Sequence, residues 1–291
     1  MSRLTLIFWL LSFGAPAQVL EGGVALRKIT PSPLLPVSGG IGVPQAVSTQ
    51  KGDLFIRAMV LRKGEEKVAL VSIDNLGWPG VLGNRTRALL PQFKPENILI
   101  SATHTHSAPD AYAFPDESGA HHADLAYLQH CVEAMAACIQ EAESGMEEVE
   151  LKVAYGKVSK GIAYNYYAPE LYDPSCGVLQ LLRKKTGKPL GTLVNFAIHP
   201  EVLGSKRGVL SPDLCGPLYT TIEEGGGGMA LFVNGALGGM VTADTRREQG
   251  EENTWEECIR IGTLLAKDAL SLIEKAKTVE NPELRVRHQV L

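Results

Sequence analysis

The chain has 291 residues, of which 45% are apolar and 21% are charged, and its formal net charge at pH 7 is −4. This composition is typical of a globular protein with enough apolar residues for a sizeable core. It contains no long basic run, and nucleic-acid binding depends on clustered lysine and arginine, so the sequence argues against a nucleic-acid partner.

The N-terminal residues show the pattern of a secretory signal. Arg3 precedes an apolar run over residues 4–14, and Ala15-Pro16-Ala17 follows it. A charged start, a short apolar segment and small residues at the cleavage point are typical of a signal peptide, and the run is too short to cross a bilayer. We therefore expect residues 1–17 to be removed and residues 18–291 to be secreted or periplasmic. A buried N-terminal strand is the alternative interpretation.

The rest of the chain alternates between strand-like and helix-like segments. Apolar or alternating runs predict strands at Leu54–Leu61, Lys67–Ile73, Ile98–Ala102, Glu150–Ala154, Gly177–Leu182, Gly191–Ala197 and Ala230–Val233. Apolar residues at helical spacing predict helices at Val81–Leu90, Ala123–Glu143, Asp213–Glu223 and Trp255–Ala276. With no internal repeat or linker, this order indicates an α/β fold of mixed sheets flanked by helices in a single large domain.

Three histidines follow two of the predicted strands. His104 and His106 come after the strand ending at Ala102, and their i, i+2 spacing directs both side chains the same way along an extended chain. His199 follows another apolar run and precedes Pro200. Strand ends at one edge of a sheet commonly carry the chemistry of α/β proteins, so we expect the three rings to meet around a divalent metal or a bound substrate. Ordinary hydrogen-bonded loop histidines are the alternative.

Two glycine-rich segments have different interpretations. Gly225–Gly228 follows a predicted helix and precedes a strand, the reverse of a phosphate loop, so we interpret it as a helix-ending turn. Asn234–Gly239 follows the strand Ala230–Val233, where its backbone N–H groups can face an anion or oxyanion.

Four segments together resemble the neutral/alkaline (non-lysosomal) ceramidases and their bacterial relatives. They occur in that family's order and span most of residues 18–291, which are therefore expected to form a ceramidase-like N-terminal domain. The segments are GGVALRKITPSPLLPVSGG, ILISATHTHSAPD, NFAIHPEVLGSKRGVLSPDLCGPLY and ALFVNGALGGMVTAD.

The resemblance implies a zinc site. It makes His104 and His199 zinc ligands and places His106 beside the metal, facing the substrate, as a catalytic residue. In the family a glutamate and a tyrosine from a later segment complete the zinc shell. The chain as given ends at Leu291, within the stretch LRVRHQVL that is predicted as a strand, so those ligands are expected beyond the sequence, and truncation at the C-terminus is one interpretation.

The resemblance also implies substrate-contacting positions, and the chain departs from the family at two of them. The glycine turn containing Gly238 lines the family's active site, and the serine just beyond it aligns with Val241, so that Thr242 can replace it only if the register shifts by one residue. Asn165 is followed by Tyr166 where the family has an arginine, which removes a planar charged anchor.

Two functions remain from the sequence. The first is an exported zinc-dependent hydrolase that acts on an amide (N-acyl) or related acyl bond of a small-molecule or lipid substrate, with ceramide specificity in doubt. The second is a catalytically degenerate relative that binds a ligand or a metal. Asp74 and Asp213 are each either a carboxylate that orients a ligand imidazole or a cap of a turn or helix.

Overall fold

A computed structural model describes residues 18–40, 42–248 and 250–289 of the chain. The expected signal peptide, residues 1–17, lies outside the described residues. Among the residues described, no helix is both long enough and apolar enough to span a membrane.

Eight strands form one mixed sheet in the order β13-β11-β10-β8-β1-β4-β5-β6. Neighbouring strands are antiparallel except at the two ends of this order, where β11 and β13 are parallel and β5 and β6 are parallel. Their bounds are β1 Leu20–Lys28, β4 Phe55–Lys63, β5 Glu66–Ile73, β6 Ile98–Ala102, β8 Glu147–Lys157, β10 Ser175–Arg183, β11 Pro189–Phe196 and β13 Met229–Asn234. Each of the seven predicted strands corresponds to one of these, and the predicted mixed α/β class is confirmed.

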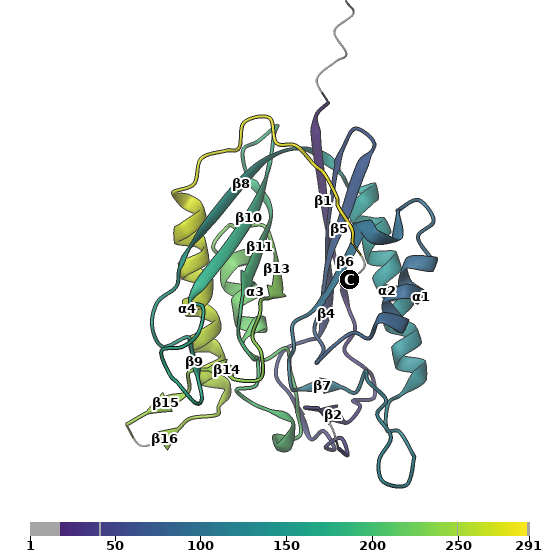
Figure 1. The fold of residues 1–291 in the computed structure, drawn as a ribbon, viewed down its shortest axis with the longest axis vertical. Coiled ribbons are helices and arrows are strands. Elements are labelled where there is room, and N and C mark those ends of the chain that lie inside the picture. Colours follow the sequence, from purple (N-terminus) through teal and green to yellow (C-terminus); the bar gives the residue numbers. More distant parts are fainter. Residues whose placement is uncertain (1–17, 41, 249, 290–291) are drawn as a thin grey trace, which may run out of the picture.

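The sheet folds into two halves that face each other (Figure 1). β1 and β8 pair only at Glu21 with Glu148 and Gly22 with Glu147. Within the strand order, the two halves of the sheet are therefore joined by this short pairing alone. Strands of both halves share one apolar layer, to which Met59 of β4 and Leu231 of β13 contribute. Because side chains alternate along a strand, the other face of each half is left to be covered by helices.

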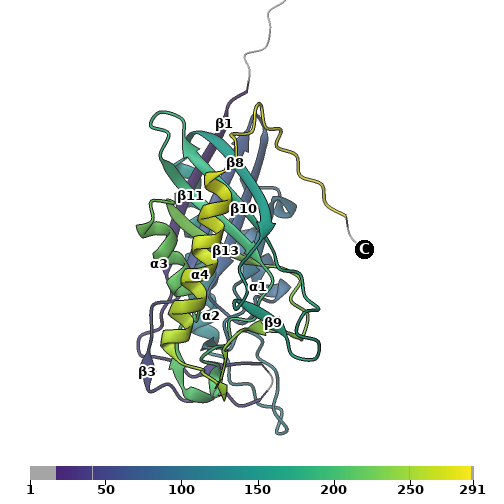
Figure 2. The same ribbon diagram turned by 90° about the vertical axis from the view of Figure 1, so that its left-hand side faces the viewer.

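Four helices cover these outer faces, two on each half (Figures 1 and 2). α2 packs on β1 and β4, with α1 against it, while α3 packs on β13 and α4 on β8 and β10. The helix bounds are α1 Gly80–Ala88, α2 Leu125–Ser144, α3 Cys215–Glu224 and α4 Trp255–Glu274, and all four were predicted. The two long helices begin at residues that accept a backbone N–H with their side chains, Asp124 from Tyr127 and Thr254 from Glu257. The result is a four-layer arrangement of helices, two sheet halves and helices.

Short elements complete the fold and mostly surround one end of the sheet. They are β2 Val37–Ser38, β3 Thr49–Gln50, β7 Ala108–Pro109, β9 Ala163–Asn165, β12 Val209–Leu210, β14 Val241–Ala243, β15 Arg246–Arg247, β16 Gly250–Glu251 and the 3-10 turns η1 Pro95–Asn97 and η2 Ser205–Arg207. The glycine run Gly225–Gly228 ends α3, as predicted, with the Gly225 N–H donating to Thr221.

Two sequence-based expectations differ from the structure. β1 was not predicted, although it lies in the middle of the sheet, because Gly22 and Gly23 interrupt its apolar pattern. These glycines are required by packing, since a Cβ on Gly23 would lie 1.9 Å from the Ala142 carbonyl oxygen of α2. The prediction of a strand from Leu284 onward is wrong for residues 284–289, which pair with no strand in the structure.

The topology brings the carboxyl ends of β6 and β11 to the same end of the molecule (Figure 1). Each belongs to a parallel edge pair, β5–β6 or β11–β13, and the facing of the two halves places these pairs close together. Ser72 Oγ of β5 donates to the carbonyl oxygen of Phe232 in β13 across the interface, 2.5 Å away. The segments that leave β6 and β11 carry the three histidines.

Candidate metal centre and adjoining cavity

His104 leaves β6 in a left-handed backbone conformation, with φ of 72°. Its N–H donates to the Asn75 carbonyl over 2.9 Å, and its ring Nδ1 lies 2.6 Å from the carbonyl oxygen of Leu76. A carbonyl can only accept, so Nδ1 carries the proton and Nε2 presents a lone pair. Positive φ is uncommon outside glycine, and here the segment after β5 holds it in place with these two bonds.

His199 is held in the same way, but by a residue of a strand. Its N–H and its ring Nδ1 both approach the carbonyl oxygen of Val241 in β14, at 3.1 and 2.6 Å. The Nε2 atom of His199 is therefore also left with a lone pair. Imidazoles that bind metals commonly donate their second nitrogen to a carbonyl in this manner, which fixes both the tautomer and the ring orientation.

His106 is the third ring of the group. Its N–H donates to the Pro200 carbonyl over 3.0 Å, which ties the segment after β6 to the one after β11. Its Nε2 atom is buried and has no hydrogen-bond partner in the part of the chain that the structure describes. Burial, followed by the neighbouring His104 and His199 rings, lowers the pKa of His106 to about 3, so this ring is neutral near pH 7.

The three rings form one compact cluster, as the sequence predicted. Their centroids are 4.8 Å apart for His104 and His199, 4.9 Å for His104 and His106, and 5.8 Å for His106 and His199. One nitrogen from each ring lies within 4.8 Å of the others, a spacing that can hold a metal ion. Desolvation by burial also lowers the pKa of His104, which favours the neutral, metal-binding form. Two free lone pairs and one unpartnered buried nitrogen fit a divalent metal.

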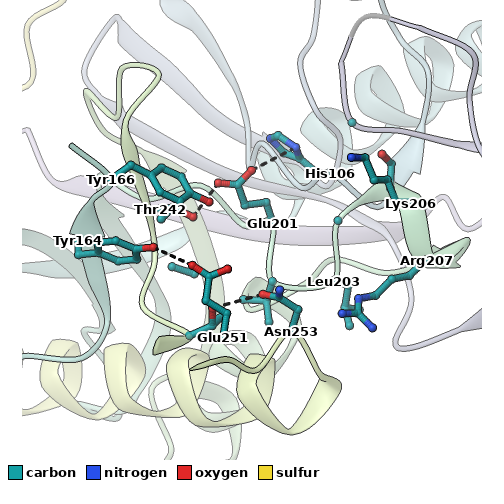
Figure 3. A pocket seen from close by; sticks show the side chains of 16 residues that line it. His106, Tyr164, Tyr166, Glu201, Leu203, Lys206, Arg207, Thr242, Glu251 and Asn253 are labelled. Atoms are coloured by element: carbon teal, nitrogen blue, oxygen red, sulfur yellow. Dashed lines mark hydrogen bonds and ion pairs between the residues drawn. The ribbon is translucent and has the colours of Figure 1, made fainter. Parts of the chain in front are cut away.

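Glu201 and Thr242 form a polar pair beside this cluster (Figure 3). Thr242 Oγ1 donates to Glu201 Oε1 over 2.7 Å, and Glu201 Oε2 lies 3.6 Å from Nδ1 of His106. Glu201 was not predicted as a site residue. The sequence signal for Glu201 was its position two residues after His199, because side chains two residues apart lie on the same side of an extended chain.

A cavity of about 570 Å³ opens next to the pair. Its size suits a small-molecule ligand. Figure 3 shows side chains converging on it from the β9, β14 and β16 strands and from the η2 turn. The side chains on its wall include His106, Tyr164, Tyr166, Glu201, Lys206, Arg207, Thr242, Thr245, Glu251 and Asn253.

Comparison with solved structures finds the same architecture in ceramidases. The neutral ceramidase from Pseudomonas aeruginosa matches with a TM-score of 0.74 and 17% sequence identity over 90% of this chain and 46% of its own. The chain has a ceramidase-like fold. A ceramidase complexed with C2 matches equally well, with a TM-score of 0.74 and 17% identity over 90% of this chain and 45% of its own. The chain therefore spans about half the length of these structures. No family model and no curated protein sequence matches it.

The predicted substrate-binding residues Asn165, Tyr166 and Gly238 differ in their position relative to the cavity. Tyr166 lines the cavity and is 53% exposed. Asn165 is buried, accepts the N–H groups of Tyr167 and Ala168 with its side-chain oxygen and donates to the Leu171 carbonyl, so its side chain organises that loop. Neither Asn165 nor Gly238 is among the residues that line the cavity, and their part in substrate binding stays a prediction.

The pairing of β14 with β9 sets the register at the family's serine position. Val241 pairs with Asn165 and Thr242 with Tyr164. Alternation along β14 buries the Val241 side chain in the apolar cluster beneath α4 and directs that of Thr242 to the cavity. Thr242 thus presents its hydroxyl to the cavity, while the Val241 side chain faces the core.

Asp74 and Asp213 contact none of the three histidines with a hydrogen bond. Asp74 is buried and accepts the Phe55 N–H and the Tyr219 hydroxyl, and burial raises its pKa to about 6. Asp213 accepts the N–H groups of Leu203 and Leu214, which joins the loop after His199 to the start of α3. The carbonyl oxygens of Leu76 and Val241 orient the rings instead, so the interpretation of these carboxylates as orienting groups is wrong.

Proposed function

We propose that the chain is a zinc-dependent hydrolase that acts on an amide (N-acyl) or related acyl bond. The observation that carries this proposal is the histidine cluster at the edge of the cavity, in which His104 and His199 each donate Nδ1–H to a carbonyl and present Nε2. Nitrogen donors of neutral imidazoles suit zinc. In this proposal His104 and His199 hold the metal and His106 lies beside it. The ceramidase-like fold supports the same assignment.

When bound, zinc supplies Lewis acidity, which polarises an acyl carbonyl and provides hydroxide near neutral pH. The protein's own contribution is positioning. With Nδ1 of His106 toward Glu201, the unpartnered Nε2 would accept the proton that the attacking water loses as it adds to the acyl carbonyl. Thr242, held by its hydrogen bond to Glu201, keeps its oxygen lone pairs available to the substrate.

A second function is favoured by one observation. Tyr166 occupies the place on the cavity wall where the resembling family has an arginine, and tyrosine cannot make the bidentate, charged contacts of a guanidinium. A relative that binds a metal or a ligand without turnover is therefore the alternative. Export through cleavage after Ala17 is part of both proposals and is supported by the N-terminal sequence pattern.

The proposal is tested with purified protein, with and without zinc, on fluorogenic acyl amides and esters of several chain lengths. Hydrolysis that depends on added zinc and is lost in the His104→Ala and His199→Ala variants supports the hydrolase. The matched control is His122→Ala, since His122 is paired with Asp116 outside the cluster. Zinc binding without any hydrolysis would favour the alternative.

A further inference from the structure

One wall of the cavity combines two carboxylates with two tyrosines and reaches the histidine cluster at Glu201. We call Tyr164, Tyr166, Glu201 and Glu251 the acidic tyrosine wall (Figure 3). The Tyr164 hydroxyl donates to Glu251 over 3.3 Å, and the Tyr164 and Tyr166 rings meet edge to face with centroids 5.4 Å apart. The wall is therefore a connected surface with a defined geometry.

The two carboxylates of this wall are not neutralised by the protein. Within residues 18–40, 42–248 and 250–289, neither Glu201 nor Glu251 forms an ion pair with a lysine or an arginine. Arg246 stacks on the Tyr164 ring at 3.8 Å, but its guanidinium is engaged by Asp244 at 2.8 and 2.9 Å. Glu201 has only 26% of its side chain exposed, so a complementary charge in the cavity interacts with it through less water than at an open surface.

The aliphatic side chains of the cavity offer little surface to an alkyl chain. They are Val202, Leu203 and Ala243, which are 2%, 7% and 3% exposed and so lie mostly beneath the wall, and the exposed apolar surface includes the Tyr166 ring. Burying methylene groups stabilises a bound alkyl chain in proportion to the apolar area covered, and covered aliphatic side chains contribute little of that area. Lys206 and Arg207 occupy the opposite side and make that side polar too (Figure 3).

We propose that the cavity takes a small hydrophilic acyl compound with a cationic amine, which the acidic tyrosine wall recognises. Two carboxylates attract the ammonium group, and the exposed face of Tyr166 provides a cation–π contact. The acyl group then lies toward His106, which borders both the cavity and the cluster. This inference rests on the proposed function only for the step of hydrolysis, because recognition of the amine can be measured without turnover.

The binding test uses three acetamides of the same carbon-chain length whose terminal groups are cationic, neutral or anionic. They are N-acetyl-1,4-diaminobutane, its hydroxyl analogue N-(4-hydroxybutyl)acetamide and its carboxylate analogue N-acetyl-4-aminobutanoate, titrated calorimetrically into chelator-treated protein at low salt. We expect the cationic compound to bind about tenfold more tightly than the hydroxyl analogue and the anionic compound to bind most weakly. Raising the salt concentration should reduce the differences in affinity among the three compounds, because salt screens partly exposed charges.

Two variants test whether Glu251 causes the preference for the cationic compound. Glu251→Gln should reduce the cationic preference several-fold, whereas Glu148→Gln, on β8 and outside the cavity, should leave it unchanged. Equal binding of all three compounds, or a preference unaffected by Glu251→Gln, would overturn the inference. Repeating the series with zinc and measuring amide hydrolysis separates the two proposals. Cation-selective binding without hydrolysis refutes the proposed function alone, and hydrolysis without charge preference refutes this inference alone.

Discussion

Thr242 on β14 and Glu201 after β11 are joined by a 2.7 Å hydrogen bond at the edge of the histidine cluster. Thr242→Val, which removes the hydroxyl while keeping the side-chain shape, should lower zinc-dependent hydrolysis by about 10²-fold, because the substrate loses the oxygen acceptor that positions it. Thr242→Ser should retain most of the rate. Zinc stoichiometry, measured in parallel, should stay at the wild-type value in both variants, and its loss would mean that Thr242 acts through the metal site.

Substitutions at Val241 test the register of β14. Its side chain is 7% exposed and packs in the cluster beneath α4, while its carbonyl holds His199. Val241→Ser restores the residue found in the resembling family but places its hydroxyl in an apolar environment. We expect a loss of about 1–3 kcal/mol in the free energy of unfolding, measured by urea denaturation, and no gain in hydrolysis. Val241→Ala is the control for lost methyl groups. A large gain in activity in the serine variant would show that the cavity is reached from position 241.

Asp74 makes a contribution to stability that depends on pH. Its folded pKa of about 6 lies above its ordinary value of 3.8 because of burial, which outweighs the opposing effect of Arg57. Between these values the folded state holds a proton that the unfolded state has released, so the Asp74 contribution weakens as pH rises from about 4 to about 6.

The Asp74→Asn variant isolates this effect, since asparagine can accept from Phe55 and donate to Tyr219 without a charge. Its free energy of unfolding, relative to that of the wild type, should increase between pH 4 and pH 7 by up to about 3 kcal/mol. Chemical denaturation of both proteins at several pH values checks the prediction. A difference between the two proteins that is independent of pH would contradict it.

Ceramide should be a poor substrate for this 291-residue chain, even with zinc supplied. The cavity wall has Tyr166 in place of an arginine, and the apolar residues that line it are mostly buried. A fluorescent N-acyl sphingosine should therefore be hydrolysed far more slowly than a short, hydrophilic acyl amide at equal concentration. Comparable rates for the two compounds would show that a lipid binds outside the polar cavity described here.

The elements of the fold could be predicted because their periodicity is clear. Seven strands and four helices follow from apolar spacing and from helix ends such as Gly225. β1 could not, because Gly22 and Gly23 are selected by close packing against Val149 and α2, and that packing is invisible in the local sequence. The folding of one sheet into two facing halves likewise depends on the short β1–β8 pairing, which no single segment encodes.

The site was predictable at its centre and less so at its rim. His104, His106 and His199 were expected together because each follows an apolar strand, and the structure groups them. The carbonyl oxygens that orient them, from Leu76 and Val241, come from segments with no side-chain signal. Glu201 has only its spacing of two from His199 as a sequence signal, and Glu251 reaches the cavity through the position of β16, which the sequence pattern does not predict.

Zinc content tests most directly whether the histidine cluster is a metal centre. The purified chain is dialysed to equilibrium against a series of free zinc concentrations, and bound metal is measured by elemental mass spectrometry, alongside His104→Ala, His199→Ala and the control His122→Ala. The wild type and the control should approach one zinc per chain at saturation, and the two ligand variants should need a much higher free zinc concentration, because each keeps only one ring of the pair. Equal zinc content in the wild type and the His199→Ala variant would contradict the assignment of the histidine cluster as a metal centre.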